Sequence, residues 1–199
     1  MSAVLLVRLK ITDLAAWTAL ETGRRLLEPG YALDRIAREQ LLVFEAEPGA
    51  TTDSFERALG EAVRHSNFFV NPNKEHYRFL TAAERGATWP LPEGAWGILS
   101  RSREETADTR LLSQLLREHP MPGLRAIRRA KVWWLWTRGP DGGPAHAYFG
   151  GVLGELRDQK HGLLVNPHGE AAMTLTEAVP WSRVEQFLIG PAPAFRAAA

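Results

Sequence analysis

The pattern of apolar and polar positions predicts a strand and then a helix at the start of the chain. The run at 4–10 (VLLVRLK) is rich in branched apolar residues, which is typical of a buried strand. A helical pattern begins at Asp13 and ends before Pro29. Its spacings of three and four predict one inward-facing stripe, made of Leu14, Trp17, Leu20, Arg24 and Leu27.

A second strand, a second helix and a third strand follow. The long strand is expected at 36–47 and the short one at 76–80. Asp53 is predicted to cap the helix between them, with Glu56 completing a capping box. The inner face of that helix is expected to be Phe55, Leu59 and Val63.

The second half of the chain repeats this order. A strand at 96–99 is followed by a capping-box pair, Ser102 and Glu105, and by a helix that must stop at Pro120. A long strand is expected at 127–137. The apolar positions of the helix are Leu111, Leu112, Leu115 and Leu116.

The remaining elements complete the repeat. A helix ending at Gly162 and a strand at 172–175 are predicted, and 181–188 (WSRVEQFL) is expected to form one extra short helix. The apolar face of the first of these helices is Phe149, Val152, Leu153 and Leu156. The same order of strand, helix, strand, helix and strand therefore occurs twice.

The two halves also end in similar motifs. FFVNPNKEHY (68–77) and LLVNPHGEAA (163–172) both place two bulky residues and a valine before Asn-Pro, with a glutamate three positions after the proline. The asparagines, Asn71 and Asn166, are 166 − 71 = 95 positions apart. We interpret the chain as one small unit that has been duplicated.

This duplication defines the expected domains and the fold class. The units are 1–85 and 95–180, joined by a linker at 86–94, and 181–199 is a short helix with a frayed tail. The expected fold is α+β: two units, each with two helices on one face of a mainly antiparallel sheet, related by a pseudo-twofold axis.

Composition excludes several classes of function. The chain has no cysteine, which excludes disulfides, cysteine nucleophiles and thiolate metal sites. A net charge of +1 argues against nucleic acid as a partner. No apolar run reaches the roughly 20 residues of a membrane span, and no signal peptide is evident, so we expect a cytoplasmic protein without membrane contact.

The element order and the Asn-Pro endings resemble PurS, the small non-catalytic subunit of phosphoribosylformylglycinamidine synthase. Gly30-Tyr31 before the first long strand and Lys131-Val132 within the second are similar to elements of that family, although Gln40 stands where the first half would carry the strand lysine. The resemblance implies two tandem ferredoxin-like units. It also implies a scaffold in purine biosynthesis that bridges the amidotransferase and synthetase subunits, with no cofactor.

The candidate contact residues lie in and around KVWWLW (131–136). Alternation places Val132, Trp134 and Trp136 on one face and Trp133 and Leu135 on the other. We expect this strand to pack mainly within the molecule. The candidate partner-binding residues are Arg128, Arg129, Lys131 and Trp133.

The Asn-Pro pairs are interpreted as structural motifs. Proline disfavours the helical region for the residue before it, so Asn71-Pro72 and Asn166-Pro167 should turn the chain toward the last strand of each unit. The asparagine side chains can bond to nearby backbone there. A contact with a partner subunit is the alternative.

Other chemistry has little support in the sequence. Six histidines are present, but His65 with His76 and His161 with His168 do not have metal-ligand spacing, so no metal is expected. No nucleophile elbow or phosphate loop occurs, so no catalytic residue is assigned. The alternative to a scaffold is a tandem ferredoxin-like protein that binds a small metabolite between its halves. An independent enzyme ranks third, and a further homodimer of the pseudo-dimer is left open.

Overall fold

The computed structural model describes residues 2–65, 68–80, 88–104, 106–121, 123–154, 163–166, 169–177 and 179–191. The elements of the first half are β1 (Ser2–Leu9), α1 (Leu14–Leu26), β2 (Ala32–Ala46), α2 (Thr52–His65) and β3 (Glu75–Leu80). Those of the second half are β4 (Trp96–Ser102), α3 (Thr106–Glu118), β5 (Leu124–Arg138), α4 (His146–Phe149), the π-helical turn η1 (Gly150–Gly154) and β6 (Glu170–Leu175). Helix α5 (Trp181–Ile189) follows β6.

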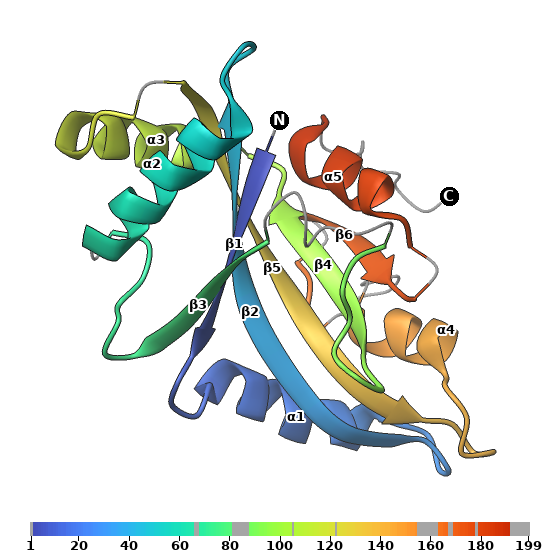
Figure 1. The fold of residues 1–199 in the computed structure, drawn as a ribbon. Helices are drawn as coiled ribbons and strands as arrows, with labels where there is room; N and C mark the ends of the chain where they lie inside the picture. Colours follow the sequence, from blue (N-terminus) through green and yellow to red (C-terminus); the bar gives the residue numbers. More distant parts are fainter. Residues whose placement is uncertain are drawn as a thin grey trace.

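Strands from both halves form one six-stranded sheet in the order β3-β1-β2-β5-β4-β6 (Figure 1). Each neighbouring pair of strands is antiparallel. The central strands β2 and β5 have 15 residues each and pair from Ala32–Arg138 to Ala46–Leu124. The protein is therefore an α+β protein with an antiparallel sheet that crosses the boundary between the halves.

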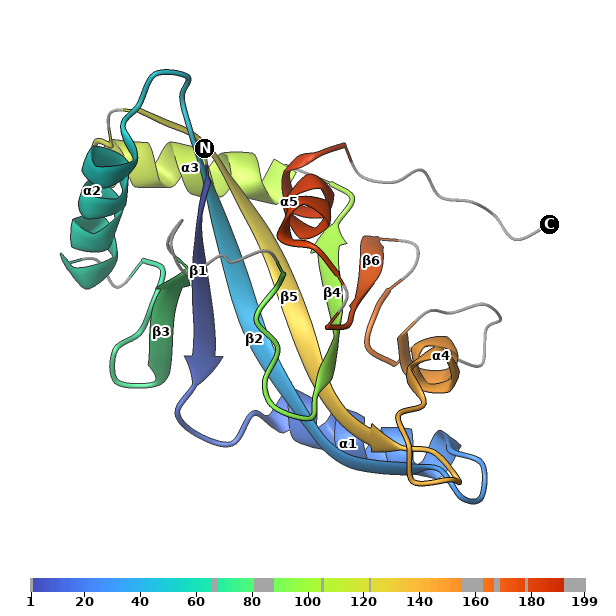
Figure 2. The same cartoon turned by 45° about the vertical axis from the view of Figure 1, so that its right-hand side comes forward.

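Helices cover the two faces of this sheet unequally. Ile36 and Phe44 of β2 point to the face that carries α1 to α4, whereas Val43 points to the face that carries α5. In Figure 2, α1 and α3 lie behind the strands and α5 lies in front of them. We call these the helix face and the α5 face.

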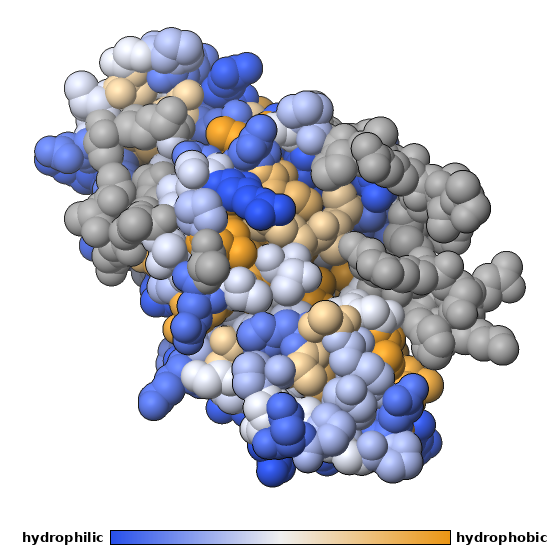
Figure 3. All heavy atoms as spheres, turned by 90° about the vertical axis from the view of Figure 1, so that its right-hand side faces the viewer, coloured by the Kyte–Doolittle hydropathy of each residue, from blue (hydrophilic) through white to orange (hydrophobic). Residues whose placement is uncertain are grey.

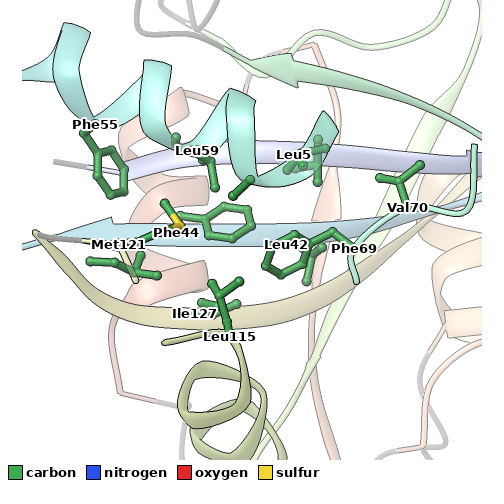
Figure 4. Packing of buried hydrophobic residues seen from close by; sticks show 14 of the residues in the cluster. Leu5, Leu42, Phe44, Phe55, Leu59, Phe69, Val70, Leu115, Met121 and Ile127 are labelled. Carbon is green, nitrogen blue, oxygen red and sulfur yellow. The ribbon is translucent and has the colours of Figure 1, made fainter. Parts of the chain in front are cut away.

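Helices from both halves share the core clusters of the helix face. Helix α3, from the second half, places Leu115 in a cluster with Phe55 and Leu59 of α2, over Phe44 (Figure 4). Helix α1, from the first half, packs with α4 and η1 over Trp133. Helix α1 packs mainly on β2 and α3 mainly on β5, and the helices of the two halves meet because these two strands lie side by side.

The predicted apolar stripe of α1 is only partly confirmed: Leu20 and Leu27 pack against the core, but Leu14 and Trp17 do not. Leu14 and Trp17 are 71% and 57% exposed, and the buried residues of the helix are Ala16, Ala19 and Gly23. A Cβ atom added to Gly23 would lie 2.9 Å from Leu33 Cδ2, so the small residues let α1 lie very close to β2. Leu14 and Trp17 are left on the outer side of the helix.

The predicted helix starts also need correction. The helix α2 begins beside Thr51, whose carbonyl accepts the N–H of Phe55, and Asp53 lies inside its first turn rather than at the cap. Ser102 belongs to the end of β4 and accepts the N–H of Glu104, while α3 begins only at Thr106. Glu105 lies outside the described residues.

The other elements match the expectations. Phe55, Leu59 and Val63 are buried, as are Phe149 and Leu153, although the second helix of that half is a short α4 that passes into π-helical η1. The predicted positions Leu156 and Gly162 lie outside the described residues. Helix α5 is present and places Trp181, Val184 and Leu188 in the core of the α5 face.

Candidate functional site

Each half contains the same hydrogen-bonded turn before its edge strand. The backbone N–H of Asn71 donates to Glu75 Oε2 at 2.7 Å, and that of Asn166 donates to Glu170 Oε2 at 2.9 Å. In return, each glutamate N–H donates to the carbonyl of its asparagine, at 2.8 Å for Glu75 and 2.7 Å for Glu170. The repeated sequence motif therefore forms the same hydrogen-bonded turn in both halves.

The first turn has two further hydrogen bonds. Asn71 Oδ1 accepts a hydrogen bond from the N–H of Asn73 at 3.1 Å. The carbonyl of Pro72 accepts a hydrogen bond from Lys10 Nζ. Pro167 lies outside the described residues. The sequence pattern contained the glutamates but assigned them no role; the structure shows that they close the turns.

The two halves meet at a polar groove on the helix face, which we call the central groove. At its centre Gln40 of β2 pairs directly with Lys131 of β5. The neighbouring strands complete a matched set, because Val7 pairs with Gln40 and Ser100 pairs with Lys131. A cavity of about 300 Å³ lies here, with side chains that include Arg38, Gln40, Ser100, Asp108, Arg129, Lys131 and Glu170.

The cations of this groove are matched by acids. Arg38 pairs with Asp13, the N-cap of α1, at 2.9 Å. Arg129 pairs with Asp108, in the first turn of α3, at 2.8 Å. In both cases an acid near a helix N-terminus, where the helix dipole favours negative charge, holds a strand arginine.

The groove also contains a third ion pair and a buried hydroxyl. Lys131 pairs with Glu170 at 2.7 Å, so the glutamate that closes the second turn also reaches the centre of the sheet. Ser100 is fully buried, and its Oγ has no hydrogen-bond partner among the described residues. A buried hydroxyl without a partner is uncommon in folded proteins.

The predicted contact residues do not form one surface. Arg129 and Lys131 lie on the helix face, whereas Arg128 points to the α5 face, where it pairs with Glu45. Trp133 is 6% exposed and lies in the core under α1, with the Arg38 guanidinium 5.5 Å from its ring centre.

The aromatic strand packs within the molecule, as its alternation predicted. Trp134 is buried on the α5 face and donates its Nε1–H to Glu39 at 3.0 Å. Trp136 donates to the carbonyl of Glu93 at 3.0 Å. These two bonds tie β5 to β2 and to the segment that enters β4.

A separate cavity of about 360 Å³ lies between α4, η1 and β6. Its lining includes His146, Gly150, Gly151, Gly154 and Thr174. Burial lowers the pKa of His146, and the nearby charge of Glu177 opposes that shift. Figure 3 views the molecule from this side and shows apolar residues interspersed with hydrophilic ones.

The described part of the chain contains neither a cluster of metal ligands nor a membrane-spanning helix. No group of three or more potential metal ligands occurs in it. His65 contacts Glu61 at 3.1 Å on the surface of α2, and His76 is exposed on β3, while His161 and His168 lie outside the described residues. Among the described helices, none has the length and apolar composition of a membrane span.

No protein-family model, curated protein or solved structure matches the chain. The structure by itself defines the class: an α+β protein whose two halves contribute three strands each to one antiparallel sheet. The groove where β2 and β5 pair contains three ion pairs, Arg38–Asp13, Arg129–Asp108 and Lys131–Glu170.

Proposed function

We propose that this chain is a fused pair of PurS-like units that acts as a non-catalytic scaffold. It would bridge the amidotransferase and synthetase subunits of phosphoribosylformylglycinamidine synthase. The observation that carries the proposal is the direct pairing of Gln40 with Lys131, which occupy equivalent positions in the two halves. The units are 1–85 and 95–180, joined by 86–94 and followed by 181–199.

Strand register supports the duplication. Leu5 pairs with Leu42 in the first half, and Ile98 pairs with Trp133 in the second, so both pairs step away from the Gln40–Lys131 centre by the same two residues. On the outer side, Val4 pairs with Leu80 and Gly97 pairs with Leu175. A pseudo-twofold axis through the central pair relates these positions.

The ion pairs and turns follow the same relation. The Asp13–Arg38 pair corresponds to the Asp108–Arg129 pair, and the turn closed by Glu75 corresponds to the turn closed by Glu170. Shared backbone order can arise from packing rules alone, but matched side-chain contacts at matched positions are more specific. They favour two copies of one ancestral unit.

A fused pair suits an assembly role. Covalent linkage makes pairing of the two units intramolecular, so the composite surface exists at any protein concentration. Each half can then diverge for a different partner: the strand that has Leu42 and Val43 in the first half has Trp133 and Trp134 in the second. The proposal includes a cytosolic location, where purine synthesis takes place.

The direct test is reconstitution with the amidotransferase and synthetase from the same organism. Size-exclusion chromatography with light scattering should show a ternary complex when glutamine and nucleotide are present, and omission of this chain should abolish it. A complex that forms equally without the chain, or no complex under any condition, contradicts the scaffold role. Glutaminase or ATPase turnover by the pure chain, lost on a point substitution in it, also contradicts it.

A second candidate function is the binding of a small anionic metabolite in the central groove. The specific observation is the hydroxyl of Ser100 beside Lys131, which has no hydrogen-bond partner in the described part of the chain and lies at a cavity of about 300 Å³. Native mass spectrometry of the freshly purified protein tests this function. A retained ligand that is lost in the Lys131→Met variant supports it, and an unliganded mass for the wild type contradicts it.

A further inference from the structure

Arg8 and Arg101 occupy equivalent positions in the two halves. Each follows the residue that pairs with the centre of the sheet, Val7 for Arg8 and Ser100 for Arg101. On the outer side, Arg8 pairs with His76 and Arg101 pairs with Ala171, each five positions after the asparagine of its turn. Both arginines therefore project from the α5 face at related places.

In the second half, the arginine at this position contacts the end of helix α5. Arg101 is 4% exposed, and its guanidinium donates to the carbonyls of Leu188 at 3.3 Å and Gly190 at 2.6 Å. The ring of Phe187 lies 5.6 Å from it. Arg101 thus receives the C-terminal end of α5, where carbonyl groups lack helical partners and the helix dipole is negative.

The first half presents a groove at the equivalent place. Arg8 is exposed beside a cavity of about 500 Å³, formed by Leu6, His76 and Arg78 on one side and by 90–92 on the other. This cavity shares Arg8, Glu39, His76 and Pro92 with a larger one of about 780 Å³. The second cavity continues along β2 to Arg35, Trp136 and Trp17. We call the two together the arginine groove.

In the central groove between β2 and β5, Arg38, Arg129 and Lys131 each pair with an acid. The arginine groove has three arginines without such a pair among the described residues. Arg8, Arg35 and Arg78 are exposed, and none of them forms a salt bridge with a described residue. The guanidinium of Arg35 lies over the ring of Trp136 at 4.3 Å, which fixes its direction. The acids of the lining are Asp13, which pairs with Arg38, Glu39, which accepts the indole N–H of Trp134, and Glu93. The cations of the lining, which are Arg8, Lys10, Arg35, Arg38 and Arg78, outnumber them.

The groove also has an open strand edge and an apolar end. Pairing of β1 with β2 ends at Val7–Gln40. The carbonyls of Leu33 and Asp34 accept hydrogen bonds from Arg24, so the open edge is the stretch 35–39, which within the described chain pairs only with β5. An unpaired edge offers backbone N–H and C=O groups to an incoming strand. Beside it, Ile11, Leu14 and Trp17 are more than half exposed, although large apolar side chains prefer burial.

We infer that the arginine groove binds an acidic peptide segment of a partner protein, whose carboxylates contact Arg8, Arg35 and Arg78 and whose apolar side chain packs on Trp17. Charge complementarity favours an acidic ligand. The length of the groove, and the peptide held by Arg101 at the equivalent position, favour a segment of chain over a compact anion. The inference uses the equivalence of the two strands and stands whether or not the protein is a purine-synthesis scaffold.

The probe for this inference is a fluorescein-labelled peptide of about twelve residues that alternates glutamate with valine and leucine, the pattern of a strand with one acidic face. Its counterpart carries glutamine in place of every glutamate. Fluorescence anisotropy at low salt should show the acidic peptide binding at least tenfold more tightly than the glutamine peptide. Equal affinity for the two peptides, or no binding of either, overturns the inference.

Matched variants locate the site. Arg8→Glu with Arg78→Glu should weaken binding at least tenfold, whereas Arg110→Glu with Arg125→Glu makes the same charge change on other exposed arginines and should leave it within twofold. The neutral change Trp17→Ala should weaken binding about threefold or more, and circular dichroism checks that each variant is folded.

An equal loss of affinity in both double variants means non-specific attraction and contradicts the inference. Displacement of the peptide by inorganic phosphate, at concentrations where chloride of equal ionic strength has no effect, identifies a small-anion site and contradicts it as well.

Discussion

Gln40 and Lys131 face each other across the middle of the sheet, and each is bounded on its outer side by the strand of its own half. Lys131 turns away from Gln40 toward Glu170, which holds its ammonium group at 2.7 Å. The Gln40 amide therefore lies beside Lys131 without competing for Glu170. A second lysine at position 40 would place two like charges directly opposite each other.

The substitution Gln40→Lys should therefore destabilise the fold. Like charges directly opposite in a sheet cost roughly 0.2–1 kcal/mol, and we expect about 0.5–1 kcal/mol at low salt. The cost should shrink at 0.5 M salt, where the Debye length falls to a few ångströms. Urea unfolding at both salt concentrations measures it. Gln40→Met is the uncharged control, and equal stability of the two variants at low salt would contradict the argument.

The two turn glutamates should differ in importance. Glu75→Gln removes only the charge of a hydrogen-bond acceptor and should cost about 0.5–1 kcal/mol. Glu170→Gln also breaks the ion pair with Lys131, so it should cost about 1–2 kcal/mol in total. Equilibrium unfolding of the two variants gives the comparison.

A double-mutant cycle separates the two effects. Combined with Lys131→Met, the Glu170→Gln change should show a coupling of about 0.5–1 kcal/mol, because both side chains belong to one ion pair. Glu75→Gln should add to Lys131→Met without coupling, since Glu75 makes no salt bridge with that lysine. Coupling of equal size in both cycles would mean that the ion pair is not the cause.

Arg101 is expected to be a major stabilising residue, in contrast to Arg8. Arg101→Met leaves the carbonyls of Leu188 and Gly190 without their buried donor and should cost about 2–3 kcal/mol. Arg8 is exposed, so Arg8→Met should change stability by no more than about 0.5 kcal/mol. Thermal unfolding of both variants is the measurement. A small effect of Arg101→Met would mean that α5 is held by its apolar face alone.

The sequence predicted those parts of the fold that depend on local patterns. Alternation and β-branched content located the strands, and it assigned Trp133 and Trp134 to opposite faces correctly. The inward face of α1 was missed because Ala16 and Gly23 give no hydrophobic signal, although a close helix–strand contact requires small residues. Patterns based on large apolar residues favour Leu14 and Trp17 instead, and those side chains are exposed.

Features that depend on distant residues could not be predicted. The pairing of β2 with β5, and the core clusters that join helices of both halves over these strands, are set by packing across the whole sheet. The Asn-Pro-x-x-Glu repeat was visible as letters, but the role of Glu75 and Glu170 needs the turn geometry. The Asp13–Arg38 pair joins residues on different elements that no spacing rule connects.

The last prediction concerns pH and His146. Burial lowers the pKa of its imidazole below the usual 6.5, so the folded state disfavours protonation. Below the ordinary pKa the unfolded chain binds more protons than the folded one, and the free energy of unfolding must therefore fall as the pH falls from 7 toward 5. His146→Gln should lose less stability over this interval than the wild type.

Glu177→Gln should lose more stability than the wild type between pH 7 and pH 5, because the charge of Glu177 raises the pKa of the His146 imidazole. Met173→Leu changes the lining of the same cavity without a titrating group, so its stability should shift by a constant amount at both pH values. Urea unfolding at pH 7 and pH 5 compares the four proteins, and a His146→Gln variant with the same pH dependence as the wild type would show that His146 is not the group that titrates.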